Sequence, residues 1–190
     1  EGVFGVPGGT ISNYGAVTGA GRTGVVAGLL TTTTLGVPGG TISNYGAVDL
    51  YTGGTGDDYG GIVGTILTQF STISPDCTLQ NNADVSGYRF VGGIIGDLEA
   101  ITASQVLFND TADANNTGVI NTGNVSSAAG YAGGLLGSTR GVNLIIANYT
   151  NTVDVSGTGD YIGGVVGIAY AGTLGVPGGN ISNSGTVTGT

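Results

Sequence analysis

Histidine, lysine, methionine and tryptophan are absent from this chain, and cysteine occurs once. Without histidine there is no Ser-His-Asp triad and no Cys-His pair, and the chain lacks the ligands of a His or Cys metal cage. Without lysine there is neither a phosphate-binding P-loop nor a Schiff base. Carboxylates, hydroxyls and the backbone remain, so we expect a protein that is not an enzyme and carries no cofactor.

Positive charge is equally scarce, because three arginines face twelve acidic residues and the formal net charge is −9. A chain with three cations cannot neutralise a run of phosphates, which excludes nucleic acid as a partner. The best apolar stretch, 161–172, is short and broken by glycines. A membrane helix needs roughly 20 apolar residues, so we expect no membrane insertion.

The composition also bears on the compartment. Cys77 is alone, so it forms no disulfide within the chain; we interpret it as a small buried hydrophobe, with an intermolecular bridge as the alternative. The wealth of Gly, Thr, Asn and Ser is typical of secreted or cell-surface proteins, and the start without methionine suggests a processed chain or a segment. Five sequons permit N-glycosylation, at Asn109, Asn115, Asn124, Asn148 and Asn180.

Glycine makes up 41 of the 190 residues, yet apolar residues reach 39% and the mean hydropathy is +0.29. Disordered chains combine low hydrophobicity with high charge, so this composition argues for a folded chain. The glycines then serve turns and close packing. The length predicts a single domain, 1–190.

An internal repeat organises the chain. Three nearly identical blocks read GVPGGTISNYGAVTG, GVPGGTISNYGAV and GVPGGNISNSGTVTG. Their common pattern is an apolar residue, a spacer, Asn, three spacers and Val, and it occurs six times. Its asparagines are Asn13, Asn44, Asn81, Asn121, Asn151 and Asn183, at steps of 31, 37, 40, 30 and 32 residues.

A second motif follows each of the first five copies, and it consists of a glycine pair, two aliphatic residues and a glycine. The copies are Gly60–Gly64, Gly92–Gly96, Gly133–Gly137 and Gly163–Gly167, with the variant Gly24–Gly28. Two motifs in fixed order define repeat units near 5–35, 36–74, 75–112, 113–142 and 143–173, with a half unit at 174–190.

Each unit contains short β-branched runs between glycine-rich turns, which is the pattern of β-strands. A unit of 30–41 residues cannot bury its own apolar face, but stacked units can, with layers about 4.8 Å apart. The sequence therefore predicts an all-β fold, a single parallel β-solenoid (β-helix) of about five to six coils.

Stacking gives both motifs a structural role. The six asparagines would form a polar ladder, with each amide bonded to its copy one layer away. The alternative is that each Asn only sits in a turn, where it tolerates a left-handed backbone conformation. The glycine pair permits a tight corner or close backbone packing. A phosphate-binding role fails, because these glycines open no helix and no lysine follows.

The repeats resemble the GLUG family, glycine-rich repeats of bacterial and archaeal cell-surface and secreted proteins. The resemblance covers nearly the whole chain. It rests on the Gly-Gly-aliphatic-aliphatic-Gly motifs, on the aromatic residues Phe90, Tyr131 and Tyr161 before them, and on the Asn-x-Gly-x-Val segments 13–17, 44–48, 121–125 and 183–187. Departures are Ala83, Val153 and Val25. The resemblance implies a surface-exposed repeat region, often adhesin-like, without catalytic residues.

Four further features of the sequence are candidate sites. Asp57 and Asp58 follow a Gly-rich segment that matches the start of a calcium-binding nonapeptide once, so structural calcium is a weak possibility. No pair among these aspartates, Asp97 and Glu99 is placed on one face by its spacing, as a glycosidase requires. The Thr31–Thr34 run does not recur from coil to coil, as an ice-binding array would. The nine tyrosines are scattered, and stacking surfaces for sugars are not separable from core positions.

The first and last blocks are nearly identical and neither carries a cap. An uncapped stack presents unpaired parallel edges, and like ends favour head-to-tail addition. We therefore expect an extracellular filament, sheath or surface fibre, a homopolymer whose partners are copies of itself. The alternative is an adhesin-type stalk that binds glycans or host surfaces.

Overall fold

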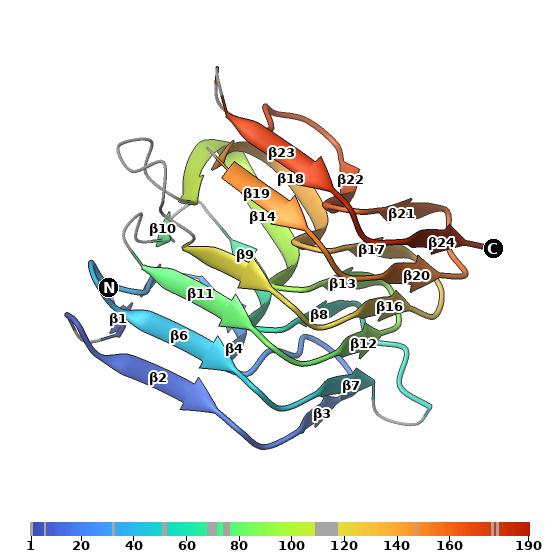
Figure 1. Cartoon of the computed structure of the whole chain (residues 1–190), viewed down its shortest axis with the longest axis horizontal. Helices are drawn as coiled ribbons and strands as arrows, with labels where there is room; N and C mark the ends of the chain where they lie inside the picture. Colours follow the sequence, from blue (N-terminus) through green and yellow to red (C-terminus); the bar gives the residue numbers. More distant parts are fainter. Residues whose placement is uncertain are drawn as a thin grey trace.

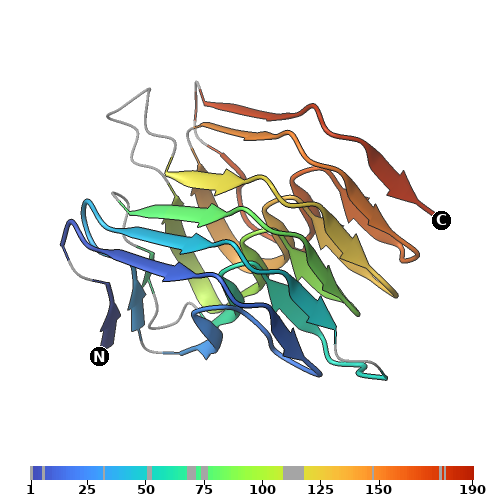
Figure 2. The same ribbon diagram turned by 60° about the horizontal axis from the view of Figure 1, so that its bottom comes forward.

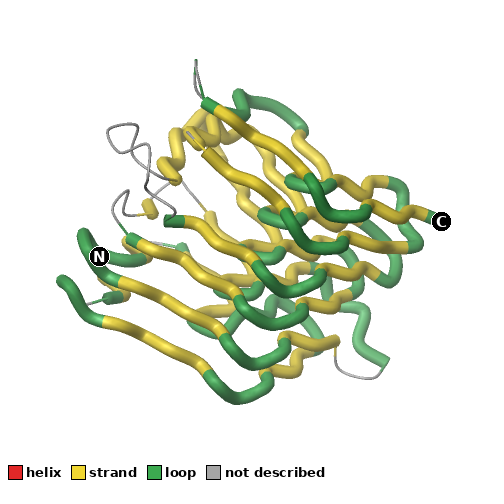
Figure 3. The backbone as a smooth tube through the Cα atoms, viewed as in Figure 1, coloured by secondary structure: helices red, strands yellow, loops and turns green. Residues whose placement is uncertain are grey.

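The computed structural model describes most of the chain, namely residues 2–5, 7–31, 33–50, 53–67, 72–73, 77–108, 118–146, 148–175, 177 and 179–190. These residues form 24 β-strands, and no helix occurs among them (Figure 3). The strands are short, and most contain three to five residues. The all-β class predicted by the sequence is confirmed.

The strands belong to six sheets, which we name A to F. Sheet A contains β1 (Gly2–Phe4), β5 (Thr33–Leu35) and β10 (Thr72–Ile73). Sheet B contains β2 (Thr10–Asn13), β6 (Thr41–Asn44), β11 (Thr78–Asn81) and β15 (Val119–Asn121). Sheet C contains β3 (Val17–Gly19), β7 (Val48–Leu50), β12 (Val85–Gly87), β16 (Val125–Ser127), β20 (Val155–Gly157) and β24 (Val187–Gly189).

The other three sheets follow the same scheme. Sheet D contains β8 (Asp58–Gly60), β13 (Phe90–Gly92), β17 (Tyr131–Gly133) and β21 (Tyr161–Gly163). Sheet E contains β4 (Ala27–Leu30), β9 (Val63–Leu67), β14 (Ile95–Phe108), β18 (Leu136–Ile146) and β22 (Val166–Ala169). Sheet F contains β19 (Asn148–Asn151) and β23 (Asn180–Asn183).

Every pairing between described strands is parallel and joins equivalent strands of consecutive repeats. Val85, for example, is in register with Val48 on one side and with Val125 on the other. Chain order is therefore also spatial order, and the strands rise in rows from the N-terminal to the C-terminal end (Figures 1 and 2). This arrangement is consistent with a parallel β-helix-like fold.

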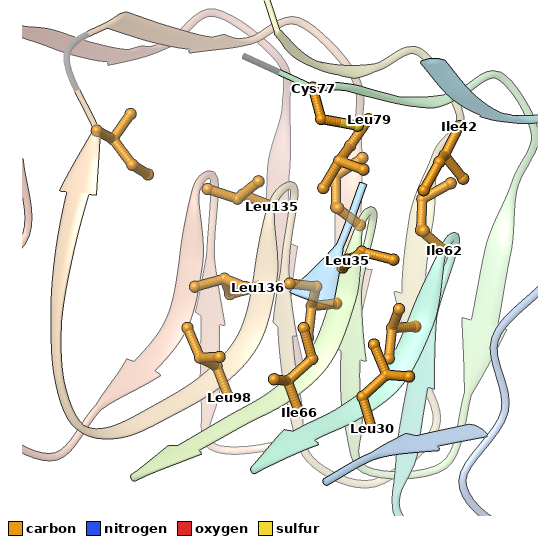
Figure 4. Packing of buried hydrophobic residues seen from close by; sticks show 14 of the residues in the cluster. Leu30, Leu35, Ile42, Ile62, Ile66, Cys77, Leu79, Leu98, Leu135 and Leu136 are labelled. Atoms are coloured by element: carbon orange, nitrogen blue, oxygen red, sulfur yellow. The ribbon is translucent and has the colours of Figure 1, made fainter. Parts of the chain in front are cut away.

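The apolar core divides into two clusters. The larger joins aliphatic side chains of sheets B and E with those of the glycine motifs, as Leu79, Leu98 and Ile62 illustrate (Figure 4). The smaller lies between sheets C and D, where Val85 and Val125 pack with Val91 and Ala132. Equivalent positions of successive repeats thus bury one another, which no repeat achieves alone.

One step of the stack is interrupted. Sheet B ends at β15, and the next equivalent strand, β19, pairs only with β23 in sheet F. Tyr149 occupies the position that Val119 holds one repeat earlier, and its buried hydroxyl donates to the carbonyl of Gly134 at 3.0 Å. The larger phenol ring needs more room than valine between the layers. The predicted continuous layering therefore fails at this step, which we call the β15–β19 seam.

Candidate functional site

The six motif asparagines lie at the C-terminal residues of their strands, one above another along sheets B and F. In four of the five steps the side-chain Nδ2 donates to Oδ1 of the next asparagine along the chain. The donor–acceptor distances are 2.9 Å for Asn13 to Asn44, 2.8 Å for Asn44 to Asn81, 2.7 Å for Asn81 to Asn121 and 2.8 Å for Asn151 to Asn183. The structure thus brings these side chains together as a row.

The same side chains also brace the turns that follow them. Asn81 Nδ2 donates to the carbonyl of Ala83 at 2.7 Å, and Asn151 Nδ2 donates to that of Val153 at 2.8 Å. The N–H of Gly46 donates back to Asn44 Oδ1 at 3.1 Å. The same amides therefore form the predicted ladder and also bond the turns that follow them, so these asparagines do more than occupy a turn.

The ladder is broken at the β15–β19 seam. Asn121 Nδ2 donates to the carbonyl of Gly134 at 3.0 Å, and no hydrogen bond joins it to Asn151. Asn151 Oδ1 is buried without a hydrogen-bond partner among the described residues. A buried acceptor without a donor is costly, so this step is a local weakness in the stack.

The glycine pairs prove to be the packing partners of the ladder. A Cβ on Gly61 would lie 2.5 Å from Asn81 Cγ, and one on Gly93 would lie 2.3 Å from Asn121 Nδ2. The same close approach recurs between Gly134 and the amide of Asn151. The sequence predicted a tight corner or close backbone packing for these glycines, and the nearest atoms to a Cβ on Gly61 and Gly93 are backbone oxygens of the next repeat, Gly93 O and Gly134 O. It did not predict that the glycines also touch the asparagine of the following repeat. The sequence held one sign of this contact, because the glycine pair and the asparagine each occur once per repeat.

Every interasparagine bond points the same way, from Nδ2 of one repeat to Oδ1 of the next. At the first layer, Asn13 Oδ1 accepts no hydrogen bond from any described residue. At the last layer, the carbonyl of Gly185 is the one acceptor among the described residues for Asn183 Nδ2, at 2.8 Å. One end of the ladder thus offers an acceptor, and the other end offers a donor.

The two ends of the stack also expose backbone edges. In the described chain β2, β3 and β4 are the outermost strands of sheets B, C and E at one end, and β21, β22, β23 and β24 are outermost at the other. Ile11 on β2 is 38% exposed and Val187 on β24 is 41% exposed, although their counterparts Ile42 and Val48 are buried. Core positions are therefore uncovered at both ends.

The aspartates suggested for calcium bind different cations of the protein. Asp58 is buried, and its Oδ2 accepts hydrogen bonds from Arg22 Nε at 3.1 Å and Thr65 Oγ1 at 2.5 Å. Asp57 is half exposed and lies 3.7 Å from Arg89. The described residues contain no group of three or more His, Cys, Asp or Glu side chains that could hold a metal. Calcium at this position remains a prediction without a ligand set.

Asp97 is the other notable acid. It is buried on β14 and accepts a hydrogen bond from Ser138 Oγ. Burial raises the pKa of Asp97 to about 6, while the bond from Ser138 and the charge of Arg140 act in the opposite direction. Glu99 lies two residues on, in register with Arg140 of β18. These carboxyls are engaged by neighbouring side chains of the stack.

The remaining sequence-predicted residues fall in three places. Of the sequons, Asn124, Asn148 and Asn180 are exposed, whereas Asn109 and Asn115 lie outside the described residues. Cys77 is free and buried in the larger core cluster, and burial raises the pKa of its thiol. A buried thiol of this kind is poorly placed for a bridge to another molecule.

A group of cationic and aromatic side chains was not found by sequence reasoning. Rings at the start of successive strands of sheet D are stacked, with centroids 4.7 Å apart for Phe90 and Tyr131 and 5.1 Å apart for Tyr131 and Tyr161. Around this stack lie Arg89, Arg140 and Tyr170. We call Arg89, Tyr131, Arg140, Tyr161 and Tyr170 the arginine–tyrosine cluster.

Two arginines hold the cluster together. The Arg89 guanidinium carbon lies 5.1 Å from the centroid of Phe90, and that of Arg140 lies 5.1 Å from Phe90 and 5.3 Å from Tyr170. Hydrogen bonding to Tyr131 raises the pKa of both Arg89 and Tyr170. Cations over ring faces are attracted by the ring quadrupole, so charge and aromatic surface support each other here.

The described residues include no helix long and apolar enough to cross a membrane. Comparison of the chain with models of known protein families, with curated proteins and with solved structures gives no match in any of the three.

Proposed function

We propose that the chain is a parallel β-solenoid of five to six coils and acts as an extracellular structural protein, a subunit that adds head to tail into a filament, sheath or surface fibre. In this arrangement each coil takes one strand from several of the described sheets, and the β15–β19 seam is an irregular step. The GLUG resemblance and the lysine-free composition support a cell-surface or secreted location. Its partners are further copies of the same chain.

The observation that carries this proposal is the match between the two open ends. Residues 11–13 and 181–183 both read Ile-Ser-Asn, and residues 17–19 and 187–189 both read Val-Thr-Gly. Within the chain, the first of these segments already pairs with an identical Ile-Ser-Asn at 42–44. A second copy placed on β23 and β24 would repeat that register with the same side chains.

The polarity of the asparagine ladder supports the same geometry. In such a joint, the free donor of Asn183 faces the free acceptor of Asn13 in the next copy. Exposed Ile11 and Val187 would be covered by Ile181 and Val17 of neighbouring copies. The outer strands at the two ends of the stack can pair with further repeats or with a second molecule. We assign this pairing to a second molecule. A joint between unlike ends does not close, so it yields a fibre.

Electron microscopy and light scattering of the purified chain test this assignment. Fibres are expected, with an axial repeat of about 25 Å for five to six layers of parallel strands. Ile11→Lys places a charge in the joint and should abolish assembly while the chain stays folded. Ala129→Lys adds the same charge at an exposed position of an inner coil and should leave assembly intact.

Two results would contradict the proposal. One is a chain that remains monomeric at high concentration, with no fibres in micrographs. The other is assembly that Ile11→Lys and Ala129→Lys impair to the same extent, because the joint would then lie elsewhere. An axial repeat far from the height of the stack would indicate lateral association.

A further inference from the structure

The arginine–tyrosine cluster combines donors and acceptors on a surface that is balanced in charge. Arg89 lies 3.7 Å from the carboxylate of Asp57, and Arg140 is in register with Glu99 on the neighbouring strand. Two of the three cations in a chain of net charge −9 are thus gathered here, each beside an acid. Such a surface can both donate and accept hydrogen bonds without a strong field of either sign.

The cluster also presents aromatic surface to solvent. Tyr161 is 46% exposed and Tyr170 is 54% exposed. Because β21 is the outermost described strand of sheet D, the ring of Tyr161 is stacked on Tyr131 on one side only. Its other face is not covered by a further ring of the described stack. Phenol rings of this kind offer an apolar face together with a polar hydroxyl.

Arg140 is fixed by the rings around it. Its guanidinium is positioned between Phe90 and Tyr170 by ring contacts, while its Nε is buried and has no hydrogen-bond partner among the described residues. An arginine fixed by stacking loses little further freedom when it binds a ligand, because its planar fork is already oriented. The Arg140 guanidinium is therefore already oriented where it contacts the exposed ring of Tyr170.

We propose that the arginine–tyrosine cluster binds an uncharged glycan. A pyranose ring has an apolar C–H face for Tyr161 and Tyr170, and hydroxyls that the two arginines and their neighbouring acids can bond. A polyanion is disfavoured because the chain as a whole is strongly acidic. A purely apolar ligand would bury the guanidinium groups without acceptors. The site is complete within one chain, so the unassembled chain can bind. The open face of Tyr161 lies at the end of the stack where the proposed joint adds the next copy, so assembly into a fibre competes with the glycan for this face.

Affinity electrophoresis of the chain through gels that contain a soluble β-glucan, mannan or galactan tests this site, with polygalacturonate as the acidic comparison. At least one neutral glycan should retard the chain, at low and high salt alike. Tyr161→Ala and Tyr170→Ala should weaken retardation about tenfold each, the size of one lost ring contact. Tyr161→Phe keeps the ring and should bind normally.

Tyr14→Ala is the matched control. Tyr14 is 75% exposed and stacks on Tyr45, and these two tyrosines follow β2 and β6 and do not belong to the cluster. This variant should bind as the unmodified chain does. The proposal is overturned if none of the neutral glycans retards the chain, or if Tyr14→Ala and Tyr161→Ala weaken retardation equally. Retardation by polygalacturonate alone that vanishes in salt would identify an anion site instead. Soluble chain is used throughout, so the outcome is separate from fibre formation.

Discussion

Replacing Asn81 by alanine tests whether the asparagine ladder holds the layers together. Asn81 is fully buried and takes part in three hydrogen bonds, with Asn44, Asn121 and the carbonyl of Ala83. Its removal leaves the Asn44 amide without this acceptor and the Ala83 carbonyl without this donor. Each buried polar group left unpaired costs about 1–3 kcal/mol, so the two groups predict a loss of about 2–6 kcal/mol in the free energy of unfolding.

Asn13→Ala provides the comparison within the same ladder. Asn13 is at the outer layer, and within the described part of the chain its amide bonds Asn44 and the carbonyl of Gly15 and nothing else. Asn44 Oδ1 keeps the N–H of Gly46 as a donor when Asn13 is lost, so the expected cost is about 1 kcal/mol. Guanidinium unfolding followed by far-UV circular dichroism measures both variants. Equal and small losses would refute the ladder and leave the asparagines a turn-bracing role alone.

Asn81→Asp refines the test, because it keeps the shape but removes the donors. An ionised carboxylate there would face Asn121 Oδ1, an acceptor, so the folded state should raise its pKa above the ordinary value of about 3.9. A raised pKa means that the folded state binds the proton more tightly. The stability of this variant should therefore fall as the pH rises above about 4. If the stability of Asn81→Asp does not depend on pH, the carboxylate at position 81 has hydrogen-bond donors around it, and the reasoning is wrong.

Three further predictions concern single groups. Because the pKa of Asp97 is raised from 3.8 to about 6, stability should decrease between pH 4 and 6 by on the order of 3 kcal/mol, and Asp97→Asn should flatten this part of the unfolding profile. Tyr149→Phe should cost at most about 1 kcal/mol by thermal unfolding, because Asn121 still donates to the Gly134 carbonyl, and a larger loss would contradict that sharing. Gly93→Ala should prevent folding, since its Cβ would lie 2.2 Å from the Gly134 carbonyl oxygen, whereas Gly21→Ala, which meets nothing within 4 Å, should fold normally by circular dichroism.

The sequence predicted the all-β class and the parallel order of the strands because identical motifs recur in every unit. When each repeat carries Asn and Val at the same spacing, parallel stacking aligns like with like, as Val48, Val85 and Val125 do. A slip of one residue would turn buried side chains outward, so the pattern determines the register. The repeat is thus sufficient to derive most of the backbone arrangement.

Three features of the site were beyond this reasoning. The contact between Gly93 and Asn121 joins different repeats, and spacing along the chain does not tell which motifs meet across a layer. The arginine–tyrosine cluster contains Arg140 and Tyr170, which belong to neither motif and recur nowhere. Tyr149 did stand in an otherwise aliphatic position, but its effect depends on the room between two layers, which no single repeat specifies.

The β15–β19 seam gives the stack a preferred place to come apart. Elsewhere neighbouring layers are fastened through strand pairing and through the asparagine row, whereas here the row and one sheet are both interrupted. A force along the direction in which the repeats stack, or fraying from the C-terminal end, should release the block that begins at β19 as one unit. The layers before β19 should loosen only afterwards. Amide hydrogen exchange can show that this block is a separate cooperative unit, because the amides of β19 and β23 should then exchange together and faster than those of β11.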